Sequence, residues 1–231
     1  MSGLKPSRRS VLTWLAAASF VTQARAATDV DLALVLAIDC SLSIDDYDYR
    51  LQLRGTGQAI LDSALVQLIE QGHNKVIAVT AFLWSSPNAQ QVIVPWRILS
   101  SAGGVSAVAD EIFGAHRTIP AGATATGDAL AFAGKLLENA PSAARRVIDV
   151  STNGHANMGK PVRTVRDELV KDGVTINGLA VSDTEPNLVN YMEREVTGGP
   201  GSFVVEASNY NAYTLAIRLK LYREISGIIT T

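Results

Sequence analysis

The sequence contains an unbroken apolar stretch, Leu32 to Ile38, that ends abruptly in Asp39-Cys40-Ser41-Leu42-Ser43. An apolar run without alternating polar residues favours a strand that is covered on both faces over one with a wet face. Such strands are typical of parallel sheets, and ligands of open α/β sheets bind beyond the carboxyl ends of the strands. The sequence therefore places Asp39, Ser41 and Ser43 where a binding site is expected.

The three polar residues alternate with Cys40 and Leu42, so their side chains are expected on one side of the chain. All three offer oxygen atoms, which a hard divalent cation prefers as ligands. This Asp-x-Ser-x-Ser pattern at the end of a buried first strand resembles the metal-ion-dependent adhesion site of von Willebrand factor type A domains. Nearly the whole chain after the leader resembles a bacterial exported family of such domains without a known function. The resemblance implies a fold and a site, and it names no ligand.

The first 26 residues are typical of a twin-arginine signal peptide rather than of a folded domain. They contain Ser7-Arg8-Arg9, a short apolar core from Val11 to Val21, and the small-residue cleavage pattern Ala24-Arg25-Ala26. The alternative is an uncleaved membrane anchor, but the apolar core is shorter than the roughly 20 residues that a span requires. We therefore expect export to the periplasm by the twin-arginine route, with no membrane span after cleavage.

The 205 residues that follow the 26-residue leader, 27–231, suit one α/β domain of ordinary size. The leader holds four of the chain's 20 basic residues and none of its 22 acidic residues, which leaves 16 basic against 22 acidic residues and a formal charge of −6. Binding to a phosphate backbone depends on a surplus of Lys and Arg on one face. This composition argues against a nucleic-acid partner.

Strand and helix patterns alternate along the rest of the chain, which is typical of a doubly wound α/β sheet with helices on both faces. Pro95 lies inside one strand pattern and marks it as an edge strand, which we expect to be antiparallel in an otherwise parallel sheet. The expected strands are Leu32–Ile38, Val76–Phe82, Gln91–Ile98, Arg146–Ser151, Val174–Val181 and Ser202–Glu206. The expected helices are Asp45–Leu68, Val105–Phe113, Ala129–Leu137, Pro161–Lys171, Asn187–Glu195 and Tyr210–Ile225.

Two glycines, Gly55 and Gly57, interrupt the first of these helices. Glycine inside a helix costs roughly 1 kcal/mol relative to alanine, so a structural reason for both is expected. Either a neighbouring segment approaches the helix closely there or the helix bends, and the sequence leaves both alternatives open.

The resemblance to type A domains implies that three loops hold the ion, with Asp39, Ser41 and Ser43 in the first loop. Thr124 of a Gly-x-Thr loop and Asn153 of a Thr-Asn-Gly turn complete the expected set. Asn153 departs from the family pattern, which has an aspartate there, and its amide oxygen brings no charge. We therefore expect a site that binds the ion weakly but attracts an acidic group strongly. Asp149 is a further acid near this strand end, although a buried acid hydrogen-bonded to a neighbouring loop is its simpler interpretation.

These features predict a non-enzymatic binding module that uses a divalent ion, Mg2+ with Mn2+ or Ca2+ as alternatives, to recognise an acidic residue of a protein partner. A second interpretation is a metal-assisted or serine hydrolase in which His155 acts as the base for Ser41 or Ser43. The serines lack a Gly-x-Ser-x-Gly context, which argues against it. A third interpretation is a degenerate domain that binds protein without an ion.

Overall fold

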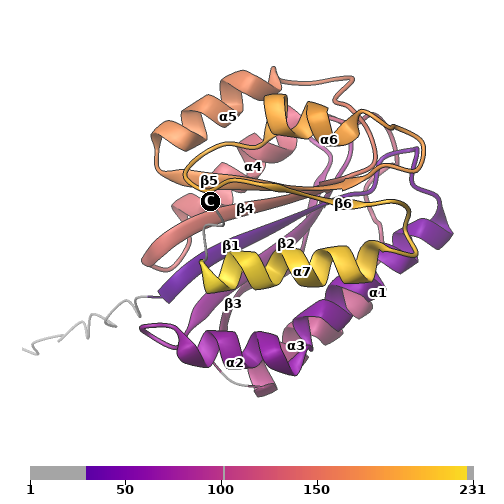
Figure 1. Cartoon of the computed structure of the whole chain (residues 1–231). Helices are drawn as coiled ribbons and strands as arrows, with labels where there is room; N and C mark the ends of the chain where they lie inside the picture. The colour runs from indigo at the N-terminus through magenta and orange to yellow at the C-terminus, as the bar shows by residue number, and fades with distance from the viewer. Residues whose placement is uncertain (1–29, 101, 228–231) are drawn as a thin grey trace, which may run out of the picture.

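A six-stranded sheet lies at the centre of the computed structural model, which describes residues 30–100 and 102–227 (Figure 1). The expected signal peptide lies outside these residues. The strand order is β3-β2-β1-β4-β5-β6, with β3 antiparallel to β2 and the other neighbours parallel. The strands are β1 (Val30–Asp39), β2 (Ile77–Trp84), β3 (Gln90–Leu99), β4 (Ala143–Thr152), β5 (Val174–Val181) and β6 (Val204–Ala207).

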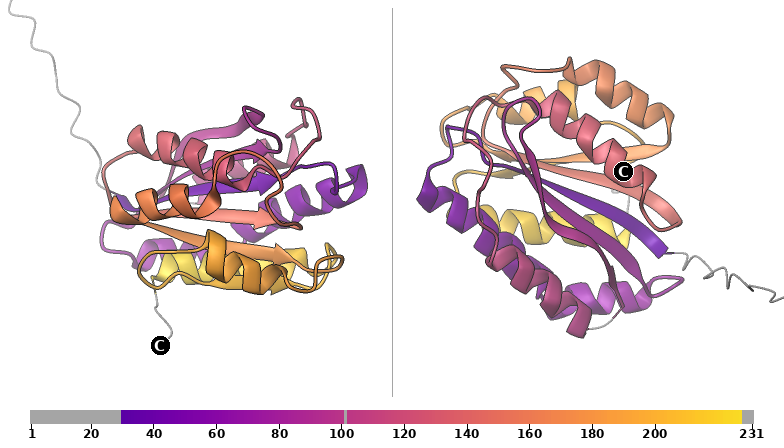
Figure 2. Two further views of the ribbon diagram at one scale, coloured as in Figure 1. Left: turned by 90° about the horizontal axis from the view of Figure 1, so that it is seen from above. Right: turned by 180° about the vertical axis from the view of Figure 1, so that it is seen from behind.

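Helices cover both faces of the sheet, as Figures 1 and 2 show. One layer contains α1 (Asp46–Ile60), α2 (Ser63–Gln71), α3 (Ala102–Phe113) and α7 (Tyr213–Ser226). The other contains α4 (Thr126–Glu138), α5 (Val162–Lys171), α6 (Leu188–Tyr191) and the π-helix η1 (Met192–Val196). This is the doubly wound, mostly parallel architecture with one antiparallel edge strand that the sequence predicts.

The central strand β1 explains the unbroken apolar stretch. Leu34 and Leu36 point into the core under α1 and α7, whereas Val35 and Ala37 point into the core under α4. Because both faces of β1 are covered, a polar side chain along Leu32–Ile38 would be buried and would cost stability unless it found a hydrogen-bond partner. Full burial of each leucine contributes about 1.5–3 kcal/mol to folding.

The segment expected to form one helix from Asp45 to Leu68 is two helices, which corrects the sequence prediction. α1 ends at Ile60, and the Asp62 side chain accepts a hydrogen bond from the Ala64 N–H at the start of α2. The expected helix Asn187–Glu195 is one continuous segment in which α6 runs directly into η1, where bonds such as Thr197 N–H to Met192 O span five residues. The break after Ile60 follows from a local hydrogen bond that hydrophobic periodicity does not record.

The two glycines of α1 mark close approaches of neighbouring helices, the first of the two alternatives that the sequence leaves open. A Cβ atom added at Gly55 would lie 2.9 Å from Thr214 Oγ1 of α7, and one at Gly57 would lie 2.4 Å from the Phe113 ring of α3. Both distances are too short for ordinary packing. Glycine therefore lets α3 and α7 pack directly on the backbone of α1.

None of the helices in the described part of the chain combines the length and apolar character needed to cross a membrane.

Candidate functional site

Three loops meet beyond the carboxyl ends of β1 and β4. The Leu42 N–H donates to Gly122 O at 2.9 Å, which joins the loop after β1 to the loop before α4. The Thr124 N–H donates to Asn157 Oδ1 at 2.9 Å, which joins that second loop to the turn after β4. Consecutive parallel strands end at the same edge of the sheet, so residues more than 100 positions apart become neighbours.

Four of the five predicted site residues form one connected chain of hydrogen bonds. Asp39 Oδ1 accepts from the Ser41 N–H at 2.7 Å. The Ser41 and Ser43 hydroxyls lie 3.3 Å apart, and the Ser43 hydroxyl donates to Asn153 Oδ1 at 2.7 Å. The structure thus brings Asp39, Ser41, Ser43 and Asn153 together, and their role as metal ligands stays a prediction.

Thr124, the fifth predicted residue, lies beside this chain but does not bond to it. Its hydroxyl has no hydrogen-bond partner among the described residues, and a Cβ atom added at Gly154 would lie 3.9 Å from Thr124 Oγ1. Thr124 also lines, with Ser43 and Asn153, a hollow of about 640 Å³ at this edge of the sheet. A residue whose hydroxyl has no partner therefore lines the same hollow as Ser43 and Asn153, the far end of the hydrogen-bonded chain.

Asp39 is a fully buried acid, and it makes no ion pair with any described residue. Burial raises its pKa to about 6, against the lowering effect of hydrogen bonds from the Thr152 hydroxyl and Ser41. A cation held nearby would offset the cost of burying this charge. The donors, which are one carboxylate, three hydroxyls and an amide oxygen, therefore fit a hard dication in chemistry, with less negative charge than two carboxylates would give.

Two residues outside the predicted set fix the position of Asp39. The Thr152 hydroxyl donates to Asp39 Oδ2 at 2.5 Å, and the Gln52 side-chain amide of α1 donates to the Asp39 carbonyl at 2.8 Å. Thr152 opens the Thr-Asn-Gly turn that the sequence singled out, so its position already suggested a role. Gln52 gave only a weak indication, as a polar residue on the otherwise apolar stripe of its helix.

Asp149 belongs to a different cluster. It is buried beneath α7, where Lys220 Nζ lies 2.8 Å from Asp149 Oδ1 and 2.6 Å from Glu224 Oε1. The interpretation of Asp149 as a buried, paired acid therefore holds, although its partner is a lysine of the last helix and not a loop.

His155 lines the same hollow as Ser43, but its ring stacks on Tyr191 of α6. The ring centroids lie 4.2 Å apart with an interplanar angle of 23°. Within the described residues, neither Ser41 nor Ser43 is hydrogen-bonded to His155. The serine–histidine pair that a hydrolase would need is thus not formed here.

A family model described as "Protein of unknown function (DUF1194)" matches residues 29–229. The chain belongs to this family. No curated protein matches the chain. The family match covers all five candidate ligands and every described helix and strand.

Solved structures with the same fold as this DUF1194 member come from varied sources. Proximal thread matrix protein 1 from the mussel byssus, solved with a zinc-occupied MIDAS motif, is 16% identical over 84% of this chain and 48% of its own, with a TM-score of 0.60. The von Willebrand factor type A protein from Catenulispora acidiphila is 17% identical over 85% of this chain and 43% of its own, with a TM-score of 0.59. The pilus adhesin SpaC from Lactobacillus rhamnosus GG is 14% identical over 86% of this chain and 31% of its own, with a TM-score of 0.63.

This DUF1194 member therefore spans half or less of the length of these three proteins. At such identities the likeness establishes the fold, which is that of von Willebrand factor type A domains.

Proposed function

We propose that this protein is a periplasmic binding module that recognises an acidic residue of a protein partner through a divalent ion. The ion, Mg2+ in our proposal, is held by Asp39, Ser41, Ser43, Thr124 and Asn153. The observation that carries the proposal is the chain of hydrogen bonds that runs from Asp39 through Ser41 and Ser43 to Asn153, beside the unpartnered hydroxyl of Thr124. The proposal also assigns residues 1–26 to a cleaved signal peptide and 27–231 to a single domain.

Each residue has a separate task in this proposal. Asp39 supplies the single negative charge, and Thr152 and Gln52 fix its orientation. Ser41, Ser43 and Thr124 supply neutral oxygens, so the donor set carries a charge of only −1. A bound dication would supply a surplus positive charge that attracts a carboxylate of the partner.

Two comparisons support the proposal. The mussel byssus protein holds zinc in its MIDAS motif, and it shares the fold of this chain. The pilus adhesin has the same fold, which agrees with a binding role outside the cytoplasm.

Calorimetric titration with Mg2+ and Mn2+ tests the proposal. We expect Thr124→Ala and Ser43→Ala each to weaken binding by about 10-fold or more, because each removes one oxygen donor. Thr184→Ala is the matched control, since Thr184 lines the same hollow but is not among the proposed ligands. Wild-type protein that binds neither ion, or equal losses in all three variants, would reject the proposed ligand set.

A chelator distinguishes the ion-dependent module from an ion-free one. We expect EDTA to abolish capture of protein partners from a cell-envelope extract, and excess Mg2+ to restore it. Equal capture with and without EDTA would support ion-free protein binding instead.

A further inference from the structure

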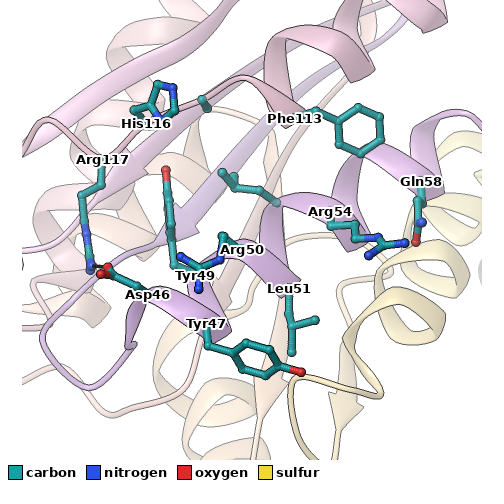
Figure 3. Close-up of a pocket in the computed structure, with 12 residues that line it drawn as sticks. Asp46, Tyr47, Tyr49, Arg50, Leu51, Arg54, Gln58, Phe113, His116 and Arg117 are labelled. Atoms are coloured by element: carbon teal, nitrogen blue, oxygen red, sulfur yellow. Dashed lines mark hydrogen bonds and ion pairs between the residues drawn. The ribbon is translucent and has the colours of Figure 1, made fainter.

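A groove of about 850 Å³ runs along α1, between that helix and the segment Phe113–Arg117 that follows α3. Figure 3 shows the segment's His116 and Arg117 facing the start of α1, and Phe113 facing Arg54 and Gln58 further along. The groove is lined by different residues from the hollow at the candidate metal site. It is therefore a second concave surface, on the α1 and α3 side of the molecule.

The floor and rim of this groove combine apolar and aromatic surface. Tyr49 and Leu53 are buried at its floor, whereas Tyr47 and Phe113 are 58% and 42% exposed at its rim. Exposed aromatic side chains beside a concave apolar floor are typical of binding surfaces.

The charges around the groove are mainly positive. Arg50 and Arg54 are exposed, and neither forms a hydrogen bond or ion pair with any described residue. They stand one helical turn apart, where like charges destabilise a helix by about 0.2–0.5 kcal/mol. Asp46 is the single acid among the lining residues, and it is already paired with Arg117 at 2.6 Å. This local excess of positive charge contrasts with the net negative charge of the chain.

The floor also contains a buried polar atom without a partner. The Tyr49 hydroxyl is covered, and it makes no hydrogen bond within the described part of the chain. A buried hydroxyl in this condition costs about 1–3 kcal/mol. Figure 3 shows Tyr49 extending from α1 towards the His116 and Arg117 segment. A chain laid in the groove could satisfy this hydroxyl after a small side-chain shift.

The shape of the groove distinguishes between classes of partner. Its α1 wall runs from Asp46 to Gln58, which is about 18 Å at 1.5 Å per residue. An extended segment of about five or six residues has that length. A membrane surface would need the exposed apolar residues on a protruding face, whereas here they border a concavity.

We propose that the α1 groove binds a short acidic segment of a protein partner, whose apolar side chains lie on Tyr49 and Leu53 and whose carboxylates pair with Arg50 and Arg54. Arginine suits this task because its guanidinium binds a carboxylate with two parallel hydrogen bonds. None of the five candidate metal ligands lines the groove, so this binding needs no ion. Arg117 also donates to the Cys40 and Ile44 carbonyls, so one end of the groove adjoins the loop that carries Ser41 and Ser43.

Fluorescence anisotropy with labelled peptides of about six residues, in which glutamate alternates with leucine, phenylalanine or tryptophan, tests this proposal on the full mature chain. We expect the peptides to bind in EDTA, and we expect added salt to weaken this binding. The combined variant Arg50→Glu and Arg54→Glu should bind them about 10-fold more weakly. The combined neutral variant, Arg50→Gln and Arg54→Gln, should lose less. The matched control combines Lys135→Glu and Lys171→Glu, which make the same charge change on α4 and α5 and should leave binding unchanged.

Two further probes separate other partners from the proposed one. Glutamine versions of the peptides should bind poorly, and vesicles of phosphatidylglycerol should not bind. The proposal is wrong if the glutamate peptides fail to bind, if they bind the Arg50→Glu and Arg54→Glu variant equally well, or if vesicles alone bind through the two arginines. Because the peptide titrations contain EDTA, their outcome is independent of whether the metal site binds an ion.

Discussion

At the scale of single residues, Asn153 determines how much charge the candidate site offers. Its side-chain oxygen accepts the hydrogen bond from Ser43 that closes the chain of oxygen donors. An aspartate of nearly the same size would keep the shape of the turn and add a second carboxylate close to Asp39. Charge is therefore the main property that distinguishes this site from the type A pattern, which has an aspartate at this position.

We predict that Asn153→Asp tightens Mg2+ or Mn2+ binding by about 10-fold, or about 1.4 kcal/mol. The added Coulomb attraction to the ion outweighs desolvation of the new carboxylate. In EDTA the same change should lower the melting temperature, since two acids then lie together without a cation. Asn139→Asp, at the exposed end of α4, is the control for charge alone. An Asn153→Asp variant that binds no more tightly than wild type would show that this turn does not contact the ion.

Asp149 predicts a pH dependence of stability. Its pKa is raised to about 7, mainly by burial and also by the charge of Glu224, whereas Lys220 opposes the rise. An ordinary aspartate titrates near 3.9, so between about pH 4 and pH 7 the folded state binds more protons at this site than the unfolded state. The stability that protonated Asp149 contributes is therefore complete below about pH 4 and is lost as the pH rises through about 7.

We expect the free energy of unfolding of wild type, relative to that of Asp149→Asn, to fall by a few kcal/mol between pH 4 and pH 8. Denaturant titrations in EDTA at several pH values measure this difference. The charged groups that face Asp149 are Lys220 and Glu224, both on α7. The uncharged Asn177 side chain of β5 donates a hydrogen bond to Glu224. A difference that stays constant or increases with pH would contradict the raised pKa.

At the scale of secondary structure, the packing of α3 on α1 depends on a missing side chain. The Phe113 ring occupies the space where a side chain at position 57 would begin. Alanine would improve the helix propensity by about 1 kcal/mol but would overlap the ring.

We predict that Gly57→Ala destabilises wild type by about 1–3 kcal/mol. In a Phe113→Ala background the overlap disappears, so the same change should be neutral or stabilising. Denaturant titrations of the four proteins of this double-mutant cycle measure the coupling. If the effect of Gly57→Ala is the same in both backgrounds, the close approach of Phe113 does not explain the glycine.

The strand pattern was predictable because burial on one or both faces leaves a clear record in the sequence. β1 has no polar residue from Leu32 to Ile38, and Pro95 marks the edge strand β3. The break between α1 and α2 was not predictable from periodicity, because Leu65 continues the apolar stripe and the cap at Asp62 interrupts it. Similarly, Lys220 lies 71 positions from Asp149, and no local pattern links a buried lysine to its acid.

The candidate site was predictable only in part. The motif at Asp39 identified the first loop, and the order of the strands brought Asn153 beside it. The hydrogen bonds from Gln52 and Thr152 were not predictable, because they depend on how α1 and β4 pack against the end of β1 in the folded chain. Ligation by the five residues stays a prediction.

At the scale of the whole molecule, Arg117 connects two concave surfaces, the hollow at the candidate metal site and the α1 groove. Its guanidinium binds Asp46 at the end of the groove and the carbonyls of the first loop. An acidic partner could therefore contact the candidate metal site and the α1 groove together, and two weak contacts on one partner would give a tighter complex.

Export also belongs to this scale, because we propose that the protein meets its partner in the periplasm. We predict that Arg8→Lys and Arg9→Lys combined prevent secretion, since the twin-arginine pair is the feature that defines the route. Immunoblots of periplasmic fractions measure the mature chain. The control is Lys5→Arg, which keeps the charge of the leader and the arginine pair. Normal periplasmic yield of the double variant would contradict the proposed route.

The most direct test of the central claim is an anomalous difference map from crystals of the mature protein grown with Mn2+. The account predicts a peak beside the hydroxyls of Ser41, Ser43 and Thr124, in contact with them or through ordered water. The peak should disappear from crystals of Thr124→Ala and persist in crystals of Thr184→Ala. A map with no peak at these hydroxyls, under conditions where Mn2+ is in large excess, would contradict the proposal that this protein recognises its partner through a metal ion.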